Sequence, residues 1–295
     1  MENTSCYPIR PVVRIAGLAA SVAAAACQAP DPAPRDLDAL VHRFWLGFEE
    51  DEDADMQEAL RAFEEITDEA ALLESHQEAE PTRLTEAETA LSRITTEPRP
   101  DPAAARGLIV TTRYACARPK LEEILVFPDQ NALYEVYDAY ERRFDTDRAP
   151  FLNEDVARIG WDGTITTSIP LSGTYTYDFR TELRRVPMPA DFGEAGDAVA
   201  PAGESAILAR TYMTEAAVWS REGPSFPQDY QIEVYIPLVG EDGVDIVHLA
   251  SVWRELNTDA LGDMEDDIVV RTTVGQMKLW DTKTEKWCAE PLPSP

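Results

Sequence analysis

Histidine and cysteine most often carry acid–base, nucleophilic or metal chemistry at neutral pH, and this sequence holds three histidines and four cysteines. The histidines His42, His76 and His248 are scattered, one to each region of the chain, so their spacing does not predict a zinc site. His248 alternates with apolar residues over 244–252, which favours a core histidine in a strand. The alternative is a pocket in which Arg210, Glu233 and His248 converge, provided that their strands pair suitably.

Carboxylates are the second group of side chains that could carry chemistry, because the chain has 55 aspartates and glutamates. Asp51, Asp53 and Asp55 alternate like the first ligands of an EF-hand calcium loop, but Met56 replaces the required glycine and Ala62 the final glutamate. A solvated acidic turn is therefore the favoured interpretation. A hydrolase that uses two carboxylates stays open as an alternative, although acids this abundant give it no specific signal.

Motifs for cofactors and nucleophiles are missing from the sequence. It has no H-E-x-x-H helix, no Walker loop, no G-x-G-x-x-G turn and no G-x-S-x-G elbow. The sequence therefore predicts no cofactor and no metal. Its net charge of −29 also argues against binding to nucleic acid, whose phosphates it would repel, and against lying flat on anionic lipid.

Aromatic residues give a further signal, because they recur on single faces of expected elements. An ordinary core explains them most simply, whereas an amphipathic pocket, apolar with a few polar groups, is the functional interpretation. The residues are Tyr134, Tyr137 and Tyr140 in one segment, Tyr175, Tyr177 and Phe179 in another, and later Trp219, Phe226, Tyr230 and Tyr235.

The first residues of the chain indicate where the protein resides. Arg10 and Arg14 precede an uncharged apolar run over 15–26, and the small residues Ala24-Ala25-Ala26 precede Cys27. This pattern resembles the signal peptide and lipobox of bacterial lipoprotein precursors. The resemblance implies removal of residues 1–26, lipid attachment to Cys27 and a place in the outer membrane rather than the inner one. A soluble secreted or periplasmic protein cut at the same point is the alternative.

Two cysteines remain once Cys6 leaves with the signal and Cys27 carries the lipid. Cys116 and Cys288 would then share an oxidising compartment, which favours a disulfide between them. A nucleophilic Cys116 with His248 as its base is the less favoured alternative, because no third group is evident.

The elements that must position these residues fall into two regions. A proline-rich tether over 27–35 is followed by an acidic helical region over 36–97, with helices at 37–48 and 56–66 and a third that begins at Thr85. Asp36 is an expected N-cap, and Thr85 with Glu88 forms an expected capping box. A linker over 98–106 leads into a strand-rich region over 107–290.

The strand-rich region is expected to hold about seven strands and an inserted helix over 120–143, with Leu133, Val136, Tyr137 and Tyr140 on one face. Asp281 is expected to cap a short terminal helix that carries Trp287 and Cys288. The strands are expected at 108–115, 164–169, 175–183, 206–213, 230–238, 244–255 and 268–274.

These elements predict an α+β fold in which a short helical region precedes a curved antiparallel sheet. The layout resembles the helix-grip, START-like folds, and a β-sandwich or half-open barrel is the alternative. We expect a non-catalytic envelope protein, held to the membrane by a lipid, that binds a small apolar ligand, a lipid or a partner protein. A periplasmic carboxylate hydrolase and a structural surface lipoprotein are the alternatives, and the sequence predicts neither the ligand nor the oligomeric state.

Overall fold

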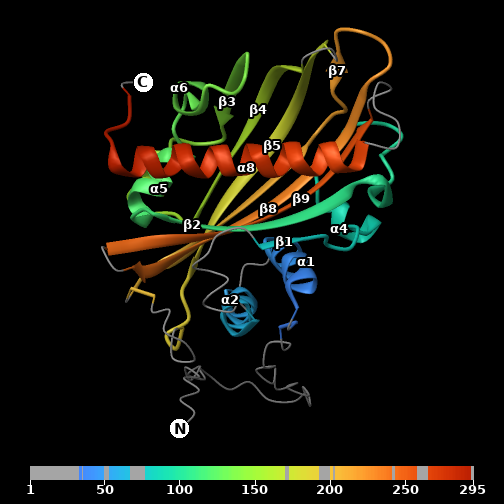
Figure 1. The fold of residues 1–295 in the computed structure, drawn as a ribbon. Coiled ribbons are helices and arrows are strands. Elements are labelled where there is room, and N and C mark those ends of the chain that lie inside the picture. Colours follow the sequence, from blue (N-terminus) through green and yellow to red (C-terminus); the bar gives the residue numbers. More distant parts are fainter. Residues whose placement is uncertain are drawn as a thin grey trace, which may run out of the picture. The chain divides into compact units, whose positions relative to one another are not determined.

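One antiparallel sheet organises the part of the chain that the computed structural model describes, namely residues 33–34, 36–49, 53–66, 77–169, 173–192, 200–201, 203–240, 243–257 and 265–293. The sheet has nine strands in the order β1-β2-β9-β8-β6-β5-β4-β3, and the short β7 pairs with β5 (Figure 1). These residues all lie in one compact unit, Asp31–Pro295.

The strands are β1 (Gln77–Ala79), β2 (Arg106–Ala115), β3 (Ala139–Phe144), β4 (Arg158–Ile169), β5 (Gly173–Pro187), β6 (Ser205–Met213), β7 (Val218–Trp219), β8 (Ser225–Gly240) and β9 (Gly243–Asn257). The helices are α1 (Leu37–Gly47), α2 (Ala54–Ile66), α4 (Glu86–Thr89), η1 (Pro102–Ala104), α5 (Arg118–Leu125), α6 (Gln130–Tyr134), α7 (Ala149–Leu152) and α8 (Glu265–Ala289).

The alternation of side chains along the strands gives the sheet two differently used faces. On one face, Val234 and Leu249 join a core with Leu40 and Phe44 of α1 and Leu60 of α2. On the other face lie the neighbouring positions of the same strands, and α8 crosses this face (Figure 1). The N-terminal helices α1 and α2 thus pack on the strand region.

Local capping explains where the N-terminal helices begin. The Asp36 carboxylate accepts from the backbone N–H of Ala39 at 2.8 Å, as expected for an N-cap. Thr85 and Glu88 form the expected capping box. The third helix is nevertheless shorter than expected, because α4 ends at Thr89 and the apolar Leu91 and Ile94 lie beyond it.

The acidic run between α1 and α2 supplies counterions for arginines buried beneath it. Arg184 donates to the carbonyls of Gly47 and Phe48 at the end of α1, at 2.9 and 3.1 Å, and to Asp53 at 2.7 Å. Arg210 pairs with Glu49. Both carboxylates are solvated as expected, since the side chains of Glu49 and Asp53 are 46% and 39% exposed. They also serve as the partner charges that buried guanidinium groups require. Asp51 lies outside the described residues.

The C-terminal element differs from the expectation. The β-branched run over 268–274 was expected to be a strand, but it belongs to α8, and Asp281 lies inside that helix rather than at its cap. Val274 and Met277 pack on Val110 and Val252 of the sheet. The burial of these α8 side chains against the sheet outweighs the strand propensity of β-branched residues, which is a weak preference.

The segment after β2 is broken where one helix was expected over 120–143. Asp129 caps a separate helix, α6, by accepting from the N–H of Ala132 at 3.0 Å. That helix ends at Glu135 in the left-handed conformation, with φ of 51°. The chain then continues as β3, which pairs with β4. Pro128, which lies between α5 and α6, disfavours helix for the residue before it and explains the break.

The fold class is the expected one, α+β with a curved antiparallel sheet and a helix across one face, which is the helix-grip layout. The helix that crosses the sheet is the terminal α8 and not the inserted segment (Figure 1). All strands described belong to one sheet, which does not fit a β-sandwich.

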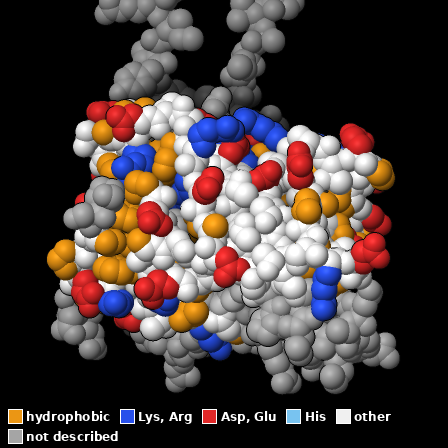
Figure 2. All heavy atoms as spheres, turned by 90° about the horizontal axis from the view of Figure 1, so that it is seen from above, with side chains coloured by type: hydrophobic (Ala, Val, Ile, Leu, Met, Phe, Trp, Pro, Cys, Tyr) orange, Lys and Arg blue, Asp and Glu red, His pale blue; other side chains and the backbone are white. Residues whose placement is uncertain are grey.

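The surface carries the acidic excess without sorting it into one patch on the face seen in Figure 2, where acidic side chains are scattered among basic and apolar ones. No helix in the described ranges is long and apolar enough to cross a membrane.

Candidate functional site

A cavity of about 120 Å³ lies between the sheet and the helices on the α8 face. Its walls combine the central strands with α5, α6 and α8. Residues that line it include Tyr114, Leu121, Tyr134, Tyr137, Tyr140, Arg142, Trp161, Phe179, Ala209, Glu233, Tyr235, His248, Met277, Trp280 and Asp281. Ligand pockets are typically apolar and aromatic with a few placed polar groups, and this lining has that composition.

The aromatic wall comes largely from the chain that joins α6 to β3. The rings of Tyr137 and Tyr140 lie 5.4 Å apart between centroids, and Tyr140 lies 5.7 Å from Phe179. From α8, Trp280 approaches Tyr134 at 6.2 Å and Tyr137 at 6.3 Å. The aromatic pocket that the sequence offered as its functional interpretation therefore exists. Tyr134, Tyr137 and Tyr140 do not share one helix, however, because they lie on α6, on the segment after it and on β3.

A charged cluster at one end of the cavity centres on His248. Its Nδ1 lies 2.9 Å from Asp281 Oδ1 of α8, and its Nε2 lies 3.4 Å from Glu233 Oε1 of β8. The imidazole stacks on the Tyr235 ring with centroids 4.3 Å apart. Thr112 donates to the other oxygen of Asp281 at 2.6 Å. The cluster therefore joins α8 to three strands of the sheet.

The two carboxylates hold His248 in its charged form. Burial on its own would lower the pKa of His248, but Asp281 and Glu233 raise it to about 10. An imidazolium donates from both nitrogens, so Nδ1–H points to Asp281 and Nε2–H points towards Glu233. The histidine thus acts as a fixed cation and proton donor at neutral pH rather than as a base.

Three buried donors that line the cavity have no hydrogen-bond partner among the described residues: Tyr114 Oη, Trp161 Nε1 and His248 Nε2. The 3.4 Å contact of His248 with Glu233 is an ion pair whose geometry is too poor for a hydrogen bond. Buried donors are almost always paired. Three unpaired donors around one cavity indicate a space that a molecule with acceptor atoms can fill.

Other polar groups of the lining are already paired. Asp229 accepts from Arg254, Thr181 and Thr211 share a hydrogen bond of 2.9 Å, and Tyr134 bonds Thr284 at 2.8 Å. The buried donors left for a ligand therefore include Tyr114 Oη and His248 Nε2 and, on β4, Trp161 Nε1.

Arg142 also lines the cavity and had no sequence signal. Its guanidinium lies 4.4 Å from the Trp161 ring centroid and 5.1 Å from that of Tyr140. It also donates to the carbonyl of Leu125 at 2.6 Å. This side chain closes the wall between β3, β4 and α5.

The expected disulfide joins Cys116 and Cys288, with Cα atoms 5.2 Å apart and a sequence separation of 172. Cys116 follows β2 and Cys288 lies in the last turn of α8. The bridge therefore fixes the end of the helix that forms one wall of the cavity, and Cys116 is not a free nucleophile.

The expected site residues separate into two groups. Glu233 and His248 meet in the cavity as the sequence suggested. Arg210 does not join them. Side chains of β6 alternate between the two faces of the sheet, and Arg210 lies on the face opposite the cavity, where its Cζ is 4.7 Å from the centroid of the Phe48 ring. Cys27 lies outside the described residues. Asp281, Tyr114 and Trp161 were not predicted as site residues. Asp281 can be recognised as one only when the terminal segment is known to form one long helix across the sheet.

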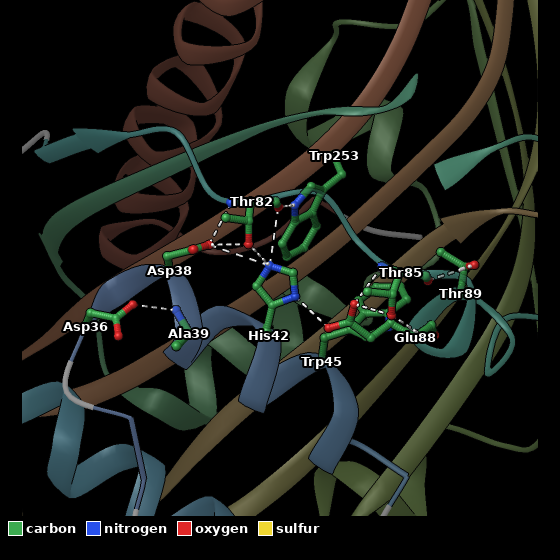
Figure 3. A network of polar contacts seen from close by, with 10 residues as sticks. All are labelled: Asp36, Asp38, Ala39, His42, Trp45, Thr82, Thr85, Glu88, Thr89 and Trp253. Atoms are coloured by element: carbon green, nitrogen blue, oxygen red, sulfur yellow. Dashed lines mark hydrogen bonds and ion pairs between the residues drawn. The ribbon is translucent and has the colours of Figure 1, made fainter. Parts of the chain in front are cut away.

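The second described histidine lies far from the cavity, in a network on the other face (Figure 3). His42 Nδ1 lies 2.5 Å from Glu88 Oε1, and Nε2 lies 3.1 Å from Thr82 Oγ1. Trp45 and Trp253 donate to the carbonyls of Glu88 and Thr82, at 3.0 and 2.8 Å. The network connects α1 to the segment 82–89 and is structural. His76 lies outside the described residues.

Among the residues that the structure describes, no group of three or more histidine, cysteine or acidic side chains is arranged to hold a metal ion.

No protein-family model and no curated protein matches this sequence. Among solved structures, a START superfamily protein from Mycobacterium smegmatis is similar with a TM-score of 0.35 and 10% identity, over 61% of this chain and 97% of that one. An uncharacterised protein from Rhizobium leguminosarum is similar with a TM-score of 0.33 and 7% identity, over 63% of this chain and 96% of that one. At these identities and TM-scores, neither likeness says what this chain binds.

Proposed function

We propose that this protein is a non-catalytic binding protein whose cavity takes a small, mostly apolar molecule. The observation that carries the proposal is the aromatic cavity of about 120 Å³ with three buried donors that lack partners. An apolar cavity of ~150 Å³ is large enough to bind benzene. The natural ligand is therefore a molecule, or the end of a molecule, on the scale of one substituted ring.

The chemistry of the lining supports binding rather than catalysis. Glu233 and Asp281 both face the His248 imidazolium, and Asp229 faces Arg254. No serine or free cysteine is among the described residues that line the cavity. A carboxylate hydrolase needs one free acid and one free base or nucleophile, and these acids are held as ion-pair partners.

We propose further that the protein works at the bacterial envelope, held by a lipid on Cys27. The support is the sequence Ala24-Ala25-Ala26-Cys27 after an apolar run. The disulfide Cys116–Cys288 is compatible with this location, because such bonds persist in oxidising compartments.

Ligand binding is tested with ethylbenzene, a neutral one-ring probe, by calorimetry and by thermal unfolding of the purified protein. We expect saturable binding and a rise in Tm, because a ligand that binds only the folded state stabilises it. Ala209 lines the cavity, so Ala209→Leu should abolish the binding. Ala104→Leu adds the same bulk at an exposed position and should not. No saturable binding of any one-ring probe to the wild type would overturn the proposal.

The anchor is tested by intact mass and membrane fractionation after expression in a Gram-negative host. The wild type should begin at Cys27 and carry a diacyl or triacyl mass increment. Cys27→Ser should lose both the increment and the membrane association. A soluble chain without lipid, cut at the same place, would overturn the anchor and leave the cavity proposal untouched.

A further inference from the structure

The end of the cavity near His248 has an unusual set of polar groups. Tyr114 lies on β2 opposite Ile246 of β9, and the neighbouring pair on the same face is Thr112 with His248. Tyr114 and His248 are thus diagonal neighbours on adjacent strands, a separation that aromatic side chains can span. Both lie near the Asp281 carboxylate, which contacts His248 directly and contributes to the raised pKa of Tyr114 after burial itself.

Both groups have a proton without a well-formed hydrogen bond, since Tyr114 Oη has no partner and His248 Nε2 has only the 3.4 Å ion pair with Glu233. Tyr114 Oη and His248 Nε2 are buried and without a hydrogen-bond partner in the described part of the chain, and each residue is about 5% exposed. A buried donor without an acceptor destabilises the folded protein. Two such donors at one place are explained if an oxygen atom of a ligand accepts from both.

The charge of this end of the cavity decides which oxygen it can be. Glu233 and Asp281 carry two negative charges against the single positive charge of the His248 imidazolium. Arg142, which lies over Trp161, adds a second positive charge to the lining, and Asp229 is neutralised by Arg254. These charges balance, so neither an anionic nor a cationic ligand gains from a net charge of the lining. An organic cation would also leave both donors unpaired.

We propose that the cavity selects uncharged ligands that carry a carbonyl or hydroxyl oxygen, which accepts hydrogen bonds from Tyr114 Oη and His248 Nε2. The inference rests on the proposed binding function and specifies its ligand class. The apolar part of the ligand then lies against Tyr137, Tyr140 and Trp280, and a ligand hydroxyl can donate in turn to Glu233.

Four probes of nearly equal size separate the possibilities by calorimetry on the purified protein. They are ethylbenzene, acetophenone, benzoate and benzylammonium. We expect acetophenone to bind about five- to 150-fold more tightly than ethylbenzene, which is the range of two net hydrogen bonds, and both ions to bind more weakly than ethylbenzene. Equal affinity for ethylbenzene and acetophenone would overturn this inference and leave the binding function intact. Tighter binding of either ion would also overturn it, and no binding of any probe would overturn both proposals.

Tyr114→Phe gives the sharper test, because it removes one unpaired hydroxyl and little else. We expect the variant to keep its affinity for ethylbenzene and lose at least half of the preference for acetophenone. Its Tm without ligand should equal or exceed that of the wild type, since no hydrogen bond of the unliganded protein is lost. Tyr230→Phe makes the same change on the other face of the sheet and should leave the preference unchanged. A Tyr114→Phe protein with the full preference for acetophenone would contradict the assignment.

Discussion

At the scale of single residues, the cavity depends on how Asp281 and Glu233 hold a buried charge. Burial would lower the pKa of His248, and the two carboxylates outweigh it and raise the pKa to about 10. A group whose pKa is raised on folding contributes stability that is complete below its unfolded value near 6.5 and is lost as the pH rises through its folded value. Stability contributed by His248 should therefore decline between about pH 6.5 and pH 10.

Asp281→Asn should lower the pKa of His248, because the closest negative charge is removed while the side chain keeps its shape. The measurement is a titration of the His248 imidazole by NMR. The decline of stability between pH 6.5 and 10 should become shallower in the same variant. Glu285→Gln makes the same charge change at an exposed position of α8 and serves as the control. An unchanged pKa of His248 in Asp281→Asn would show that Asp281 does not hold this charge.

Sequence reasoning reached half of this site. The alternation over 244–252 identified His248 as a strand residue on an apolar face, and Glu233 could be named with it because both fall in strong strand patterns. Arg210 was grouped with them because a strand pattern does not say which face of the sheet a residue shares with residues of other strands. Only the pairing of β6 with β8, Ala209 opposite Glu233, shows that Arg210 points away.

At the scale of elements, one ion pair connects α1 to the segment that contains α4. Burial lowers the pKa of His42, but Glu88 and Asp38 raise it by more, so the pKa lies above its usual value. Burial raises the pKa of Glu88, but hydrogen bonds from His42 and Thr85 lower it to a net decrease. The stability from His42 is lost as the pH rises above 6.5, and that from Glu88 is lost as the pH falls below 4.5.

Glu88→Gln should therefore destabilise the protein most between about pH 4.5 and pH 6.5, where both charges are present. We expect a loss of roughly 1–3 kcal/mol there, the range for a hydrogen bond between charged groups, and a smaller loss on either side. Urea unfolding at a series of pH values measures it. Glu86→Gln removes an exposed acid of the same helix and should cost much less. A loss that does not vary with pH would mean that the pair contributes no electrostatic stability.

The expectation of a strand over 268–274 was wrong because contacts distant in sequence decide the structure of this segment. The run over 268–274 is rich in β-branched residues. The buried face of the helix lies mainly beyond this run and consists of Val274, Met277, Asp281 and Thr284. Its partners lie on β2, β9 and α6. Such tertiary packing overrides local propensity, and no short stretch of sequence shows it. The caps at Asp36 and Thr85, by contrast, are local interactions and were predicted correctly.

At the scale of the whole molecule, the disulfide joins the end of the first long strand to the last helix. Because the sequence separation of Cys116 and Cys288 is 172, the bond restricts the unfolded chain strongly. The same bond holds α8 over the cavity. Stability and ligand affinity are therefore coupled through it.

The double variant Cys116→Ser/Cys288→Ser should lose about 2–5 kcal/mol of unfolding free energy and bind ethylbenzene more weakly, because α8 is then held by packing and by hydrogen bonds such as those of Asp281, Thr284 and Trp287 alone. Guanidinium unfolding and calorimetry measure the two effects. Reductant should lower the stability of the wild type and leave the variant unchanged. Equal stability of variant and wild type would mean that packing alone fixes α8.

The general layout was accessible from the sequence because it rests on alternation along strands and on helical spacing. The α+β class and most strands followed from these patterns, and the disulfide followed from the two cysteines that remain after Cys6 and Cys27 are assigned to the signal and the lipid. Which helix crosses the sheet, and the existence of a cavity beneath it, depend on contacts between residues such as His248 and Asp281, which meet only once the sheet and α8 are assembled.

The arginines buried beneath α1 and α2 also set the order in which the chain can fold. Glu49 precedes its partner Arg210 by 161 residues, and Asp53 precedes Arg184 by 131. A ribosome adds about 5–20 residues per second. The acidic run between α1 and α2 is therefore synthesised several seconds before either of its arginine partners. Contacts this distant in sequence form slowly. The N-terminal helices therefore gain these ion pairs only once the strands that carry Arg184 and Arg210 are present, so most of the chain must be available before the fold is complete.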